Sequence, residues 1–428
     1  MKIIEYNKTN QKELQKIMQR GDQIYYDIEE TVEDIIRSVR ENGDKSLLGY
    51  TEKFDGAKLR SLQVSDEEFE VAYKKVPGKF LKAIRVAIEN QKKFQEGIFQ
   101  KKSRVIETKP GIRVWREWRP IEKVGLYIPG GRARYPSSIV MVGVPALVSG
   151  CKEIVICTPP EANGQINPTV LVTAAELGVK KVFKVGGAQA IAAMAYGTET
   201  IPKTYKVFGA GNSYVTLAKM KVFGEVDIDM PAGPSEVMVV ADNNANVEYV
   251  AADLISQCEH GVESSAVLIT NSKEFAEKVK ESCYAQAEGL ETKDTIKKSL
   301  DAYGATIIVK NWESAAEVVN EFAPEHLELV LQDYDYFRRL VNNAGSVFLG
   351  QYASEPAGDY ATGSNHVLPT NGYAKMFEGL SVDSFGKWVE FQELTKDGLK
   401  QIKEAIDVLA SEEGLPAHAN AVDVRFKN

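Results

Sequence analysis

The residues Glu325 and His326 place a carboxylate beside an imidazole in the stretch NEFAPEHLELVL, which is otherwise largely apolar. Imidazole titrates near neutral pH, so this pair can carry general acid/base chemistry. A single histidine at the start of an element is, however, more often a packed or capping residue. The pair alone therefore leaves both interpretations open.

The other histidines also lie close to carboxylates or amides. The chain has four in all: His260, His326, His366 and His418. Gln257 and His260 are three residues apart, so on a helix both would project from one face. Asp359 and His366 lie in SEPAGDYATGSNHVLPT, a polar stretch too long for a simple turn and typical of functional loops. With His418, these oxygen and nitrogen donors would suit zinc, although no HExxH motif is present and each histidine also has a purely structural interpretation.

Two glycine-rich stretches are candidate anion sites: GAGNSY at 209–214 and GGAQAIAAMAYG at 186–197. Each follows an expected strand and opens a helix, where backbone N–H groups favour a negative charge. Neither has the G-x-G-x-x-G spacing of the common dinucleotide fingerprint. Close packing of a strand on a helix explains these glycines equally well.

The elements that must position these residues alternate between strands and helices. From Lys123 onward, short apolar runs alternate with helical periods, and a second such series begins at Glu236. Glycines follow the expected helices where positive φ is common: Gly150, Gly178, Gly197 and Gly224. The predicted fold class is α/β, with two similar open, incomplete Rossmann-like sheets and additional N- and C-terminal helical segments.

This pattern predicts a division into four parts. Residues 1–24 form an N-terminal helical arm, and residues 381–428 form a C-terminal helical tail. The first α/β domain combines 25–126, as a helical lead-in, with 236–380. The second α/β domain is 127–235.

Composition excludes several classes of partner. The 428 residues carry 52 Lys and Arg against 60 Asp and Glu, a formal charge of −8, which argues against binding to a nucleic-acid backbone. The N-terminus lacks the apolar core of a secretory signal, and no apolar run reaches the ~20 residues that span a bilayer. We expect a cytoplasmic protein with reduced cysteines and no membrane partner.

Ten motifs stand in a characteristic order along the chain: GLYIPGG, YPSS, VGGAQAIAAMAYGT, GAGNSYV, AGPSE, DLISQCEHG, FAPEHLEL, GDYATGSNHVLPT, GLSV and EEGLPAH. Over nearly its whole length, the sequence thus resembles the histidinol dehydrogenase family. The resemblance implies a zinc enzyme that oxidises L-histidinol through L-histidinal to L-histidine, passing one hydride to NAD at each step.

The resemblance also implies a role for each matching residue. Glu325 activates water and His326 is the general acid/base. The implied zinc ligands, one ion per subunit, are Gln257, His260, Asp359 and His418. The implied NAD contacts are Tyr127, Gln189 and Asn212. The implied substrate contacts are Ser235, Glu413, His366 and His326, together with the four zinc ligands. A homodimer with interleaved tails is implied, in which Glu413 and His418 complete the active site of the other subunit.

One departure from the family concerns the GAGN stretch, where the family commonly has proline and this chain has Ala210. Loss of a proline removes a fixed φ, so we expect a looser loop that still binds the cofactor. Three alternatives stay open at this point. They are a related NAD-dependent dehydrogenase of a sulfonated diol, a zinc hydrolase, and a non-catalytic metal or small-ligand binding protein.

Overall fold

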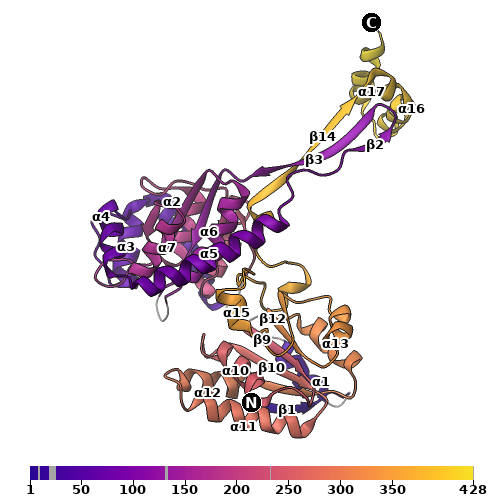
Figure 1. The fold of residues 1–428 in the computed structure, drawn as a ribbon. Coiled ribbons are helices and arrows are strands. Elements are labelled where there is room, and N and C mark those ends of the chain that lie inside the picture. The colour runs from indigo at the N-terminus through magenta and orange to yellow at the C-terminus, as the bar shows by residue number, and fades with distance from the viewer. Residues whose placement is uncertain (8–9, 19–25, 131–133, 232, 428) are drawn as a thin grey trace. The chain divides into compact units, whose positions relative to one another are not determined.

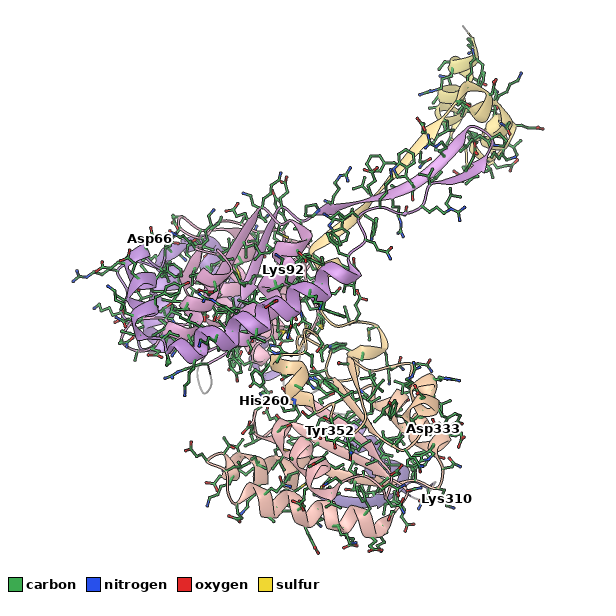
Figure 2. The ribbon with its side chains drawn as sticks, in the orientation of Figure 1. Asp66, Lys92, His260, Lys310, Asp333 and Tyr352 are labelled. Carbon is green, nitrogen blue, oxygen red and sulfur yellow. The ribbon has the colours of Figure 1, made fainter. Side chains whose placement is uncertain are left out.

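A computed structural model describes residues 1–7, 10–18, 26–130, 134–231 and 233–427 of the chain. The chain forms two compact units (Figure 1). Unit 1 comprises Met1–Gly97 with Ile121–Phe385, and unit 2 comprises Ile98–Pro120 with Gly386–Asn428. Charged side chains such as Lys92 and Lys310 project from the surface into solvent (Figure 2). Among the described residues, no helix combines the length and apolarity that crossing a membrane would require.

Unit 1 contains a parallel six-stranded sheet, here sheet A, with the strand order β1-β11-β10-β9-β12-β13. Its strands are β1 (Lys2–Glu5), β9 (Glu236–Ala241), β10 (Ser265–Thr270), β11 (Ala305–Ile308), β12 (His326–Val330) and β13 (Ser346–Leu349). Helices cover both faces, which explains why the central strands are apolar at consecutive positions. One face packs on α10 (Val247–Cys258), α11 (Lys273–Ala287) and α12 (Lys293–Tyr303). The other packs on α1 (Gln11–Met18), α13 (Trp312–Phe322) and α14 (Tyr334–Phe337).

Unit 1 also contains a parallel five-stranded sheet, here sheet B, with the strand order β6-β5-β4-β7-β8. Its strands are β4 (Lys123–Tyr127), β5 (Glu153–Thr158), β6 (Val182–Lys184), β7 (Lys206–Phe208) and β8 (Asp227–Ile228). The helices that connect them are α6 (Pro136–Ser149), α7 (Pro168–Glu176), α8 (Gly187–Tyr196) and α9 (Ser213–Val222). The glycines predicted to end helices or follow them, at 150, 178, 197 and 224, all have positive φ. The predicted fold class, α/β with two open sheets, is confirmed.

The lead-in helices pack on sheet B, which differs from the predicted division. These helices are α2 (Glu29–Asn42), α3 (Asp44–Asp55), α4 (Asp66–Lys75) and α5 (Gly78–Ile98). Their apolar residues join the two cores around sheet B, whereas residues 25–126 were expected to belong with 236–380. Strand β4 also begins before the predicted boundary at 127. Helical periodicity shows that a face is buried, but it does not show against which sheet.

Two terminal segments expected to be helical contain strands. Lys2–Glu5 forms β1, which pairs in parallel with β11 and buries Ile4 in the core of sheet A. In unit 2, β14 (Gly386–Leu394) pairs antiparallel with β3 (Ile112–Pro120), and β3 pairs with β2 (Ile106–Lys109). Cross-strand aromatic pairs, Trp118 with Trp388 and Trp115 with Phe391, stabilise this ribbon. Helices α16 (Lys396–Glu412) and α17 (Pro416–Asp423) follow it.

Candidate active site

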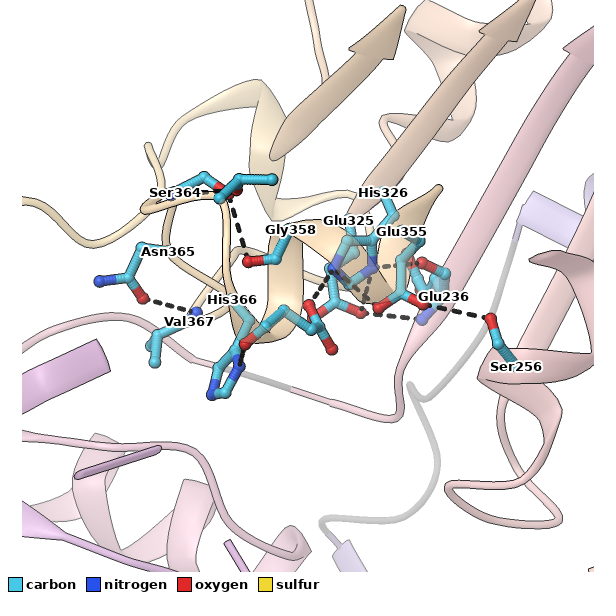
Figure 3. A network of polar contacts seen from close by, with 12 residues as sticks. Glu236, Ser256, Glu325, His326, Glu355, Gly358, Ser364, Asn365, His366 and Val367 are labelled. Carbon is cyan, nitrogen blue, oxygen red and sulfur yellow. Dashed lines mark hydrogen bonds and ion pairs between the residues drawn. The ribbon is translucent and has the colours of Figure 1, made fainter. Parts of the chain in front are cut away.

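Glu325 and His326 lie at the amino end of β12, beside the amino end of the neighbouring strand β9 in sheet A. His326 is the first residue of β12, and Glu236 is the first residue of the adjacent strand β9. The Glu236 N–H donates a hydrogen bond to Glu325 Oε2 (2.8 Å), and the Glu236 carbonyl oxygen lies 3.0 Å from His326 Nδ1 (Figure 3). Because a carbonyl oxygen only accepts, Nδ1 carries the proton and Nε2 of a neutral His326 is free to act as a base.

A short helix, α15 (Glu355–Tyr360), places two more carboxylates against this imidazole (Figure 3). His326 Nε2 lies 3.5 Å from Asp359 Oδ1 and 3.9 Å from Glu355 Oε1. Neighbouring residues fix the helix start. The Glu355 N–H donates to Glu328 Oε1 (2.8 Å), and the Ser256 hydroxyl donates to Glu355 Oε2 (3.1 Å). These contacts hold α15 against β12 and α10.

Burial and charge strongly shift the pKa values of these groups. Burial raises the pKa of Glu325 to about 8, although His326 and the Glu236 N–H partly offset this rise. Burial alone would lower the pKa of His326, but the charges of Glu325, Asp359 and Glu355 outweigh it and raise that pKa to about 10. A bound divalent cation would neutralise part of the same carboxylate charge and would therefore bring the pKa of His326 down towards neutrality.

The residues around Glu355 and Asp359 can hold a metal ion. His326, Glu355 and Asp359 offer ligand atoms that all lie within 4.8 Å of one another. In the described part of the chain, both polar atoms of the buried Gln257 side chain lack a hydrogen-bond partner, as do His326 Nε2 and Glu355 Oε1. Leaving several buried polar atoms unpaired is costly, and a cation would satisfy the acceptors among them. These nitrogen and oxygen donors fit zinc or a similar divalent ion.

The structure brings together some of the predicted ligands. Gln257 is buried in the last turn of α10, and His260 follows that helix with its side chain exposed. Asp359 lies close enough to influence the pKa of His260. Glu413 and His418 lie in unit 2, at the end of α16 and on α17, and both are exposed. Whether these two residues join the others stays a prediction.

His366 and Ser235 are two of the predicted substrate contacts. His366 Nδ1 is 3.1 Å from the Asp359 carbonyl oxygen, so it donates, and its Nε2 lies 3.4 Å from the Ser138 hydroxyl on α6. The next residue back, Asn365, donates to the Met141 carbonyl oxygen on the same helix. The loop after α15 is thus attached to the sheet B core. Ser235 directly precedes Glu236 and is partly exposed.

The predicted NAD contacts gather at the carboxyl ends of sheet B. Strands β4 and β7 are neighbours where the order of strands along the chain reverses, a position at which open α/β sheets bind ligands. Tyr127 ends β4, and its hydroxyl accepts a hydrogen bond from the Gly187 N–H (3.1 Å) at the start of α8. Gln189 is buried on α8, and the exposed Asn212 caps α9 by accepting from the Val215 N–H.

The glycines in this region allow close backbone approach. Gly209 has φ +119°, and a Cβ there would lie 2.1 Å from the carbonyl oxygen of Tyr127. A Cβ at Gly211 would crowd Val215 and the Tyr127 ring. Ala210, where the family commonly has proline, is exposed between them. The narrow loop and two helix N-termini can accommodate a pyrophosphate, so the residues present fit a dinucleotide.

Comparison with known proteins supports one family throughout. The family model described as histidinol dehydrogenase matches residues 18–426. The chain belongs to the histidinol dehydrogenase family. A histidinol dehydrogenase of Bacteroides fragilis is 48% identical over 429 residues, covering 100% of this chain and 99% of that protein. One of Methanosarcina mazei is 43% identical and covers 97% and 95%.

A solved structure agrees with this membership of the histidinol dehydrogenase family. The histidinol dehydrogenase of Elizabethkingia anophelis superimposes with a TM-score of 0.96 at 42% identity, covering 100% of this chain and 98% of that one. The resemblance predicted from the ordered motifs is confirmed. These matches do not support the zinc hydrolase, the sulfonated-diol dehydrogenase or the non-catalytic binding protein.

Sequence reasoning missed three residues that position the site. Glu236 acts through its backbone, which leaves no side-chain signal. Ser256 is one hydroxyl on an amphipathic helix. Glu328 did carry a signal, because an acidic residue two positions after His326 in a buried strand must point to the same face.

Glu328 provides a test of the site's protonation. Burial and the nearby Asp253 raise its pKa well above the usual range, so a protonated Glu328 donates to Asp253 and accepts from the Glu355 N–H. Glu328→Gln keeps both functions, and we expect its free energy of unfolding to stay within about 1 kcal/mol of wild type. Glu328→Ala leaves Asp253 and the Glu355 N–H without their hydrogen-bond partner. We expect it to lower the free energy of unfolding, measured in urea, by about 3 kcal/mol. Equal losses in the two variants would show that Glu328 is ionised.

Proposed function

We propose that this chain oxidises L-histidinol through L-histidinal to L-histidine, the last steps of histidine biosynthesis. The observation that carries this proposal is the buried Glu325–His326 pair, held by the backbone N–H and carbonyl oxygen of one residue of β9, in a chain of this family. The overall reaction converts an alcohol, water and two NAD⁺ into a carboxylate, two NADH and three protons. It therefore needs a base for the alcohol and a group that activates water.

We assign the role of base to His326. Its Nδ1–H is held by the Glu236 carbonyl, which leaves Nε2 to accept the hydroxyl proton as hydride leaves the same carbon. NAD⁺, held by Tyr127, Gln189 and Asn212 in this proposal, supplies the hydride acceptor. His326 then releases its proton before the second oxidation.

We assign the activation of water to Glu325. Adding water to the aldehyde gives a hydrate, whose carbon can lose a second hydride as a proton leaves oxygen. A carboxyl group with a pKa near working pH can orient the water and take up its proton, and burial gives Glu325 a pKa of about 8. Glu236 keeps this carboxylate in place while it changes protonation state.

Gln257, His260, Asp359 and His418 are the proposed zinc ligands, and Ser235, His366 and Glu413 the proposed substrate contacts. Bound zinc would supply a Lewis acid and a template for the substrate's amine and imidazole nitrogens. The unpaired Gln257 amide and the influence of Asp359 on the pKa of His260 support this set. Glu355 and His326, which join Asp359 in the observed cluster, would then lie beside the metal.

The proposal extends to assembly and location. We propose a homodimer in which His418 and Glu413 of one subunit complete the site of the other. A cytoplasmic location, with no nucleic-acid or membrane partner, stays a prediction from the sequence.

The first prediction concerns stoichiometry. Metal-replete protein with excess NAD⁺ and limiting L-histidinol should produce two NADH per histidinol, because one site carries out both oxidations. The measurement is the end-point absorbance of NADH against a known amount of substrate. A stable yield of one, or no NADH, would overturn the double oxidation.

The second prediction concerns His326→Asn. The asparagine amide can still donate to the Glu236 carbonyl but has no equivalent of Nε2, so kcat should fall roughly 10²- to 10⁴-fold. Metal content, measured by atomic emission, should stay near wild type because His326 is assigned as a base and not as a ligand. Loss of the metal from this variant would contradict that assignment.

The third prediction tests the shared site by mixing inactive variants. His418→Ala and His326→Asn, unfolded and refolded together in equal amounts, should regain about a quarter of wild-type activity. Half of the random dimers would be mixed, and one of their two sites would contain both native residues. Each variant refolded alone is the control. Failure to regain activity would show that His418 serves its own subunit or another purpose.

A further inference from the structure

Asp55 is a charged residue in an unfavourable environment. It is the last residue of α3, where the helix dipole disfavours a negative charge. Its Oδ2 atom is buried and accepts no hydrogen bond from any residue in the described ranges. Burial raises its pKa to about 6, so the carboxylate is mostly ionised at neutral pH without compensation. Such a group calls for a ligand or another explanation.

The course of α3 places Asp55 at the carboxyl ends of sheet B. At the start of the helix, Asp44 accepts hydrogen bonds from Thr198 and Thr200, in the loop that leads to the amino end of β7. At its end, a Cβ on Gly56 would lie 3.9 Å from Ala162, in the loop after β5. The helix thus runs in the same direction as the strands.

Tyr127 lies within reach of this carboxylate. The charge of Asp55 adds to burial in raising the pKa of Tyr127. Leu47 of α3 and Tyr127 of β4 belong to the same core, so the helix that carries Asp55 packs on the side of the sheet where Tyr127 is buried. Tyr127 is also the residue whose hydroxyl accepts the Gly187 N–H. Asp55 therefore borders the region assigned to the dinucleotide.

The usual acidic residue of a dinucleotide site is missing from its usual place. In common Rossmann domains, an acidic residue near the end of the second strand binds a ribose hydroxyl. Here the second strand of sheet B, β5, ends at the buried Thr158 and is followed by Pro159. The next acidic residue, Glu161, is exposed and accepts a hydrogen bond from Asn167. A carboxylate from outside the sheet could serve instead.

We propose that Asp55 accepts a hydrogen bond from a ribose hydroxyl of the dinucleotide and thereby selects NAD(H) over NADP(H). The inference rests on the part of the proposed function that places the dinucleotide at this edge of sheet B. A ribose hydroxyl supplies the donor that Oδ2 lacks. A ribose 2′-phosphate would bring two negative charges against an unpaired carboxylate and would be repelled.

The test measures binding of NADH and NADPH to the full-length protein by titration calorimetry. Asp55→Ala should weaken NADH binding at least 10-fold, and Asp55→Asn should reduce the preference for NADH over NADPH at least 10-fold by removing the repulsion. The control is Asp66→Asn, the same change at an exposed carboxylate on the surface (Figure 2), which should leave both affinities unchanged. An unchanged NADH to NADPH ratio in both Asp55 variants would overturn the proposal.

Thermal unfolding of the ligand-free proteins separates a role of Asp55 in nucleotide selection from a role in stabilising the fold. The pKa of Asp55 is higher in the folded than in the unfolded state, so stability falls as pH rises from about 4 to about 6 and then stays level. Asp55→Asn should therefore unfold at a higher temperature than wild type at pH 8. A lower unfolding temperature, with both affinities reduced equally, would show that Asp55 only supports the fold.

Failure of the proposal for Asp55 can be distinguished from failure of the proposed function. Protein that binds NADH through Asp55 but does not oxidise L-histidinol would overturn the substrate assignment and leave the role of Asp55 intact. Oxidation of L-histidinol with an unchanged nucleotide preference in the Asp55 variants would do the reverse.

Discussion

One residue of β9, Glu236, determines the geometry of the proposed acid/base pair through its backbone. The N–H of Glu236 holds the Glu325 carboxylate, and its carbonyl oxygen holds the His326 ring. Both contacts exist because β9 and β12 are parallel neighbours, with His326 aligned to Val237. A side chain in this role could rotate or change its protonation state, whereas a strand backbone does neither. The tautomer of His326 and the orientation of Glu325 therefore follow from the register of sheet A.

The candidate site residues lie at opposite ends of the strands in the two sheets. In sheet B, the candidate dinucleotide residues lie at the carboxyl ends, beside the strands where chain order reverses, as is usual for open α/β sheets. In sheet A, the candidate pair Glu325 and His326 lies at the amino end of β12, next to β9, which is also where chain order reverses. The carboxyl end of β12 is instead closed by Asp242, which accepts hydrogen bonds from the N–H groups of Gln332 and Asn244. In sheet A, the candidate pair therefore lies at the end of the strands where His326 is in contact with Glu355 and Asp359 of α15.

Much of this arrangement could be predicted from the sequence, for identifiable reasons. Buried parallel strands are apolar at consecutive positions, and glycines with positive φ follow their helices, so both sheets were recognisable. The packing of α2 and α5 differs from the predicted domain division because helical periodicity does not show which sheet a helix covers. The apolar faces of these helices would look the same against either sheet. The strand β14 was missed although GKWVEFQEL contains the alternation and aromatic residues of a strand. Within the candidate site, the ordered motifs predicted roles for Glu325 and His326, and these roles stay a prediction. The backbone contacts of Glu236 could not be predicted, because residue type does not encode them.

The loop after α15 follows the strands of sheet A along the chain, but its later residues are in contact with elements of sheet B. Asp359 faces His326 on sheet A, while Asn365 is hydrogen-bonded to the backbone of α6 and His366 lies against Ser138. Further on, the Val382 N–H donates to Gln95 on α5, and Phe385 stacks on Phe208 of β7. The loop therefore acts as a mechanical link. Because Asp359 is in contact with His326 and His366 with Ser138, any motion that altered the spacing of the two sheets would displace His366 relative to His326.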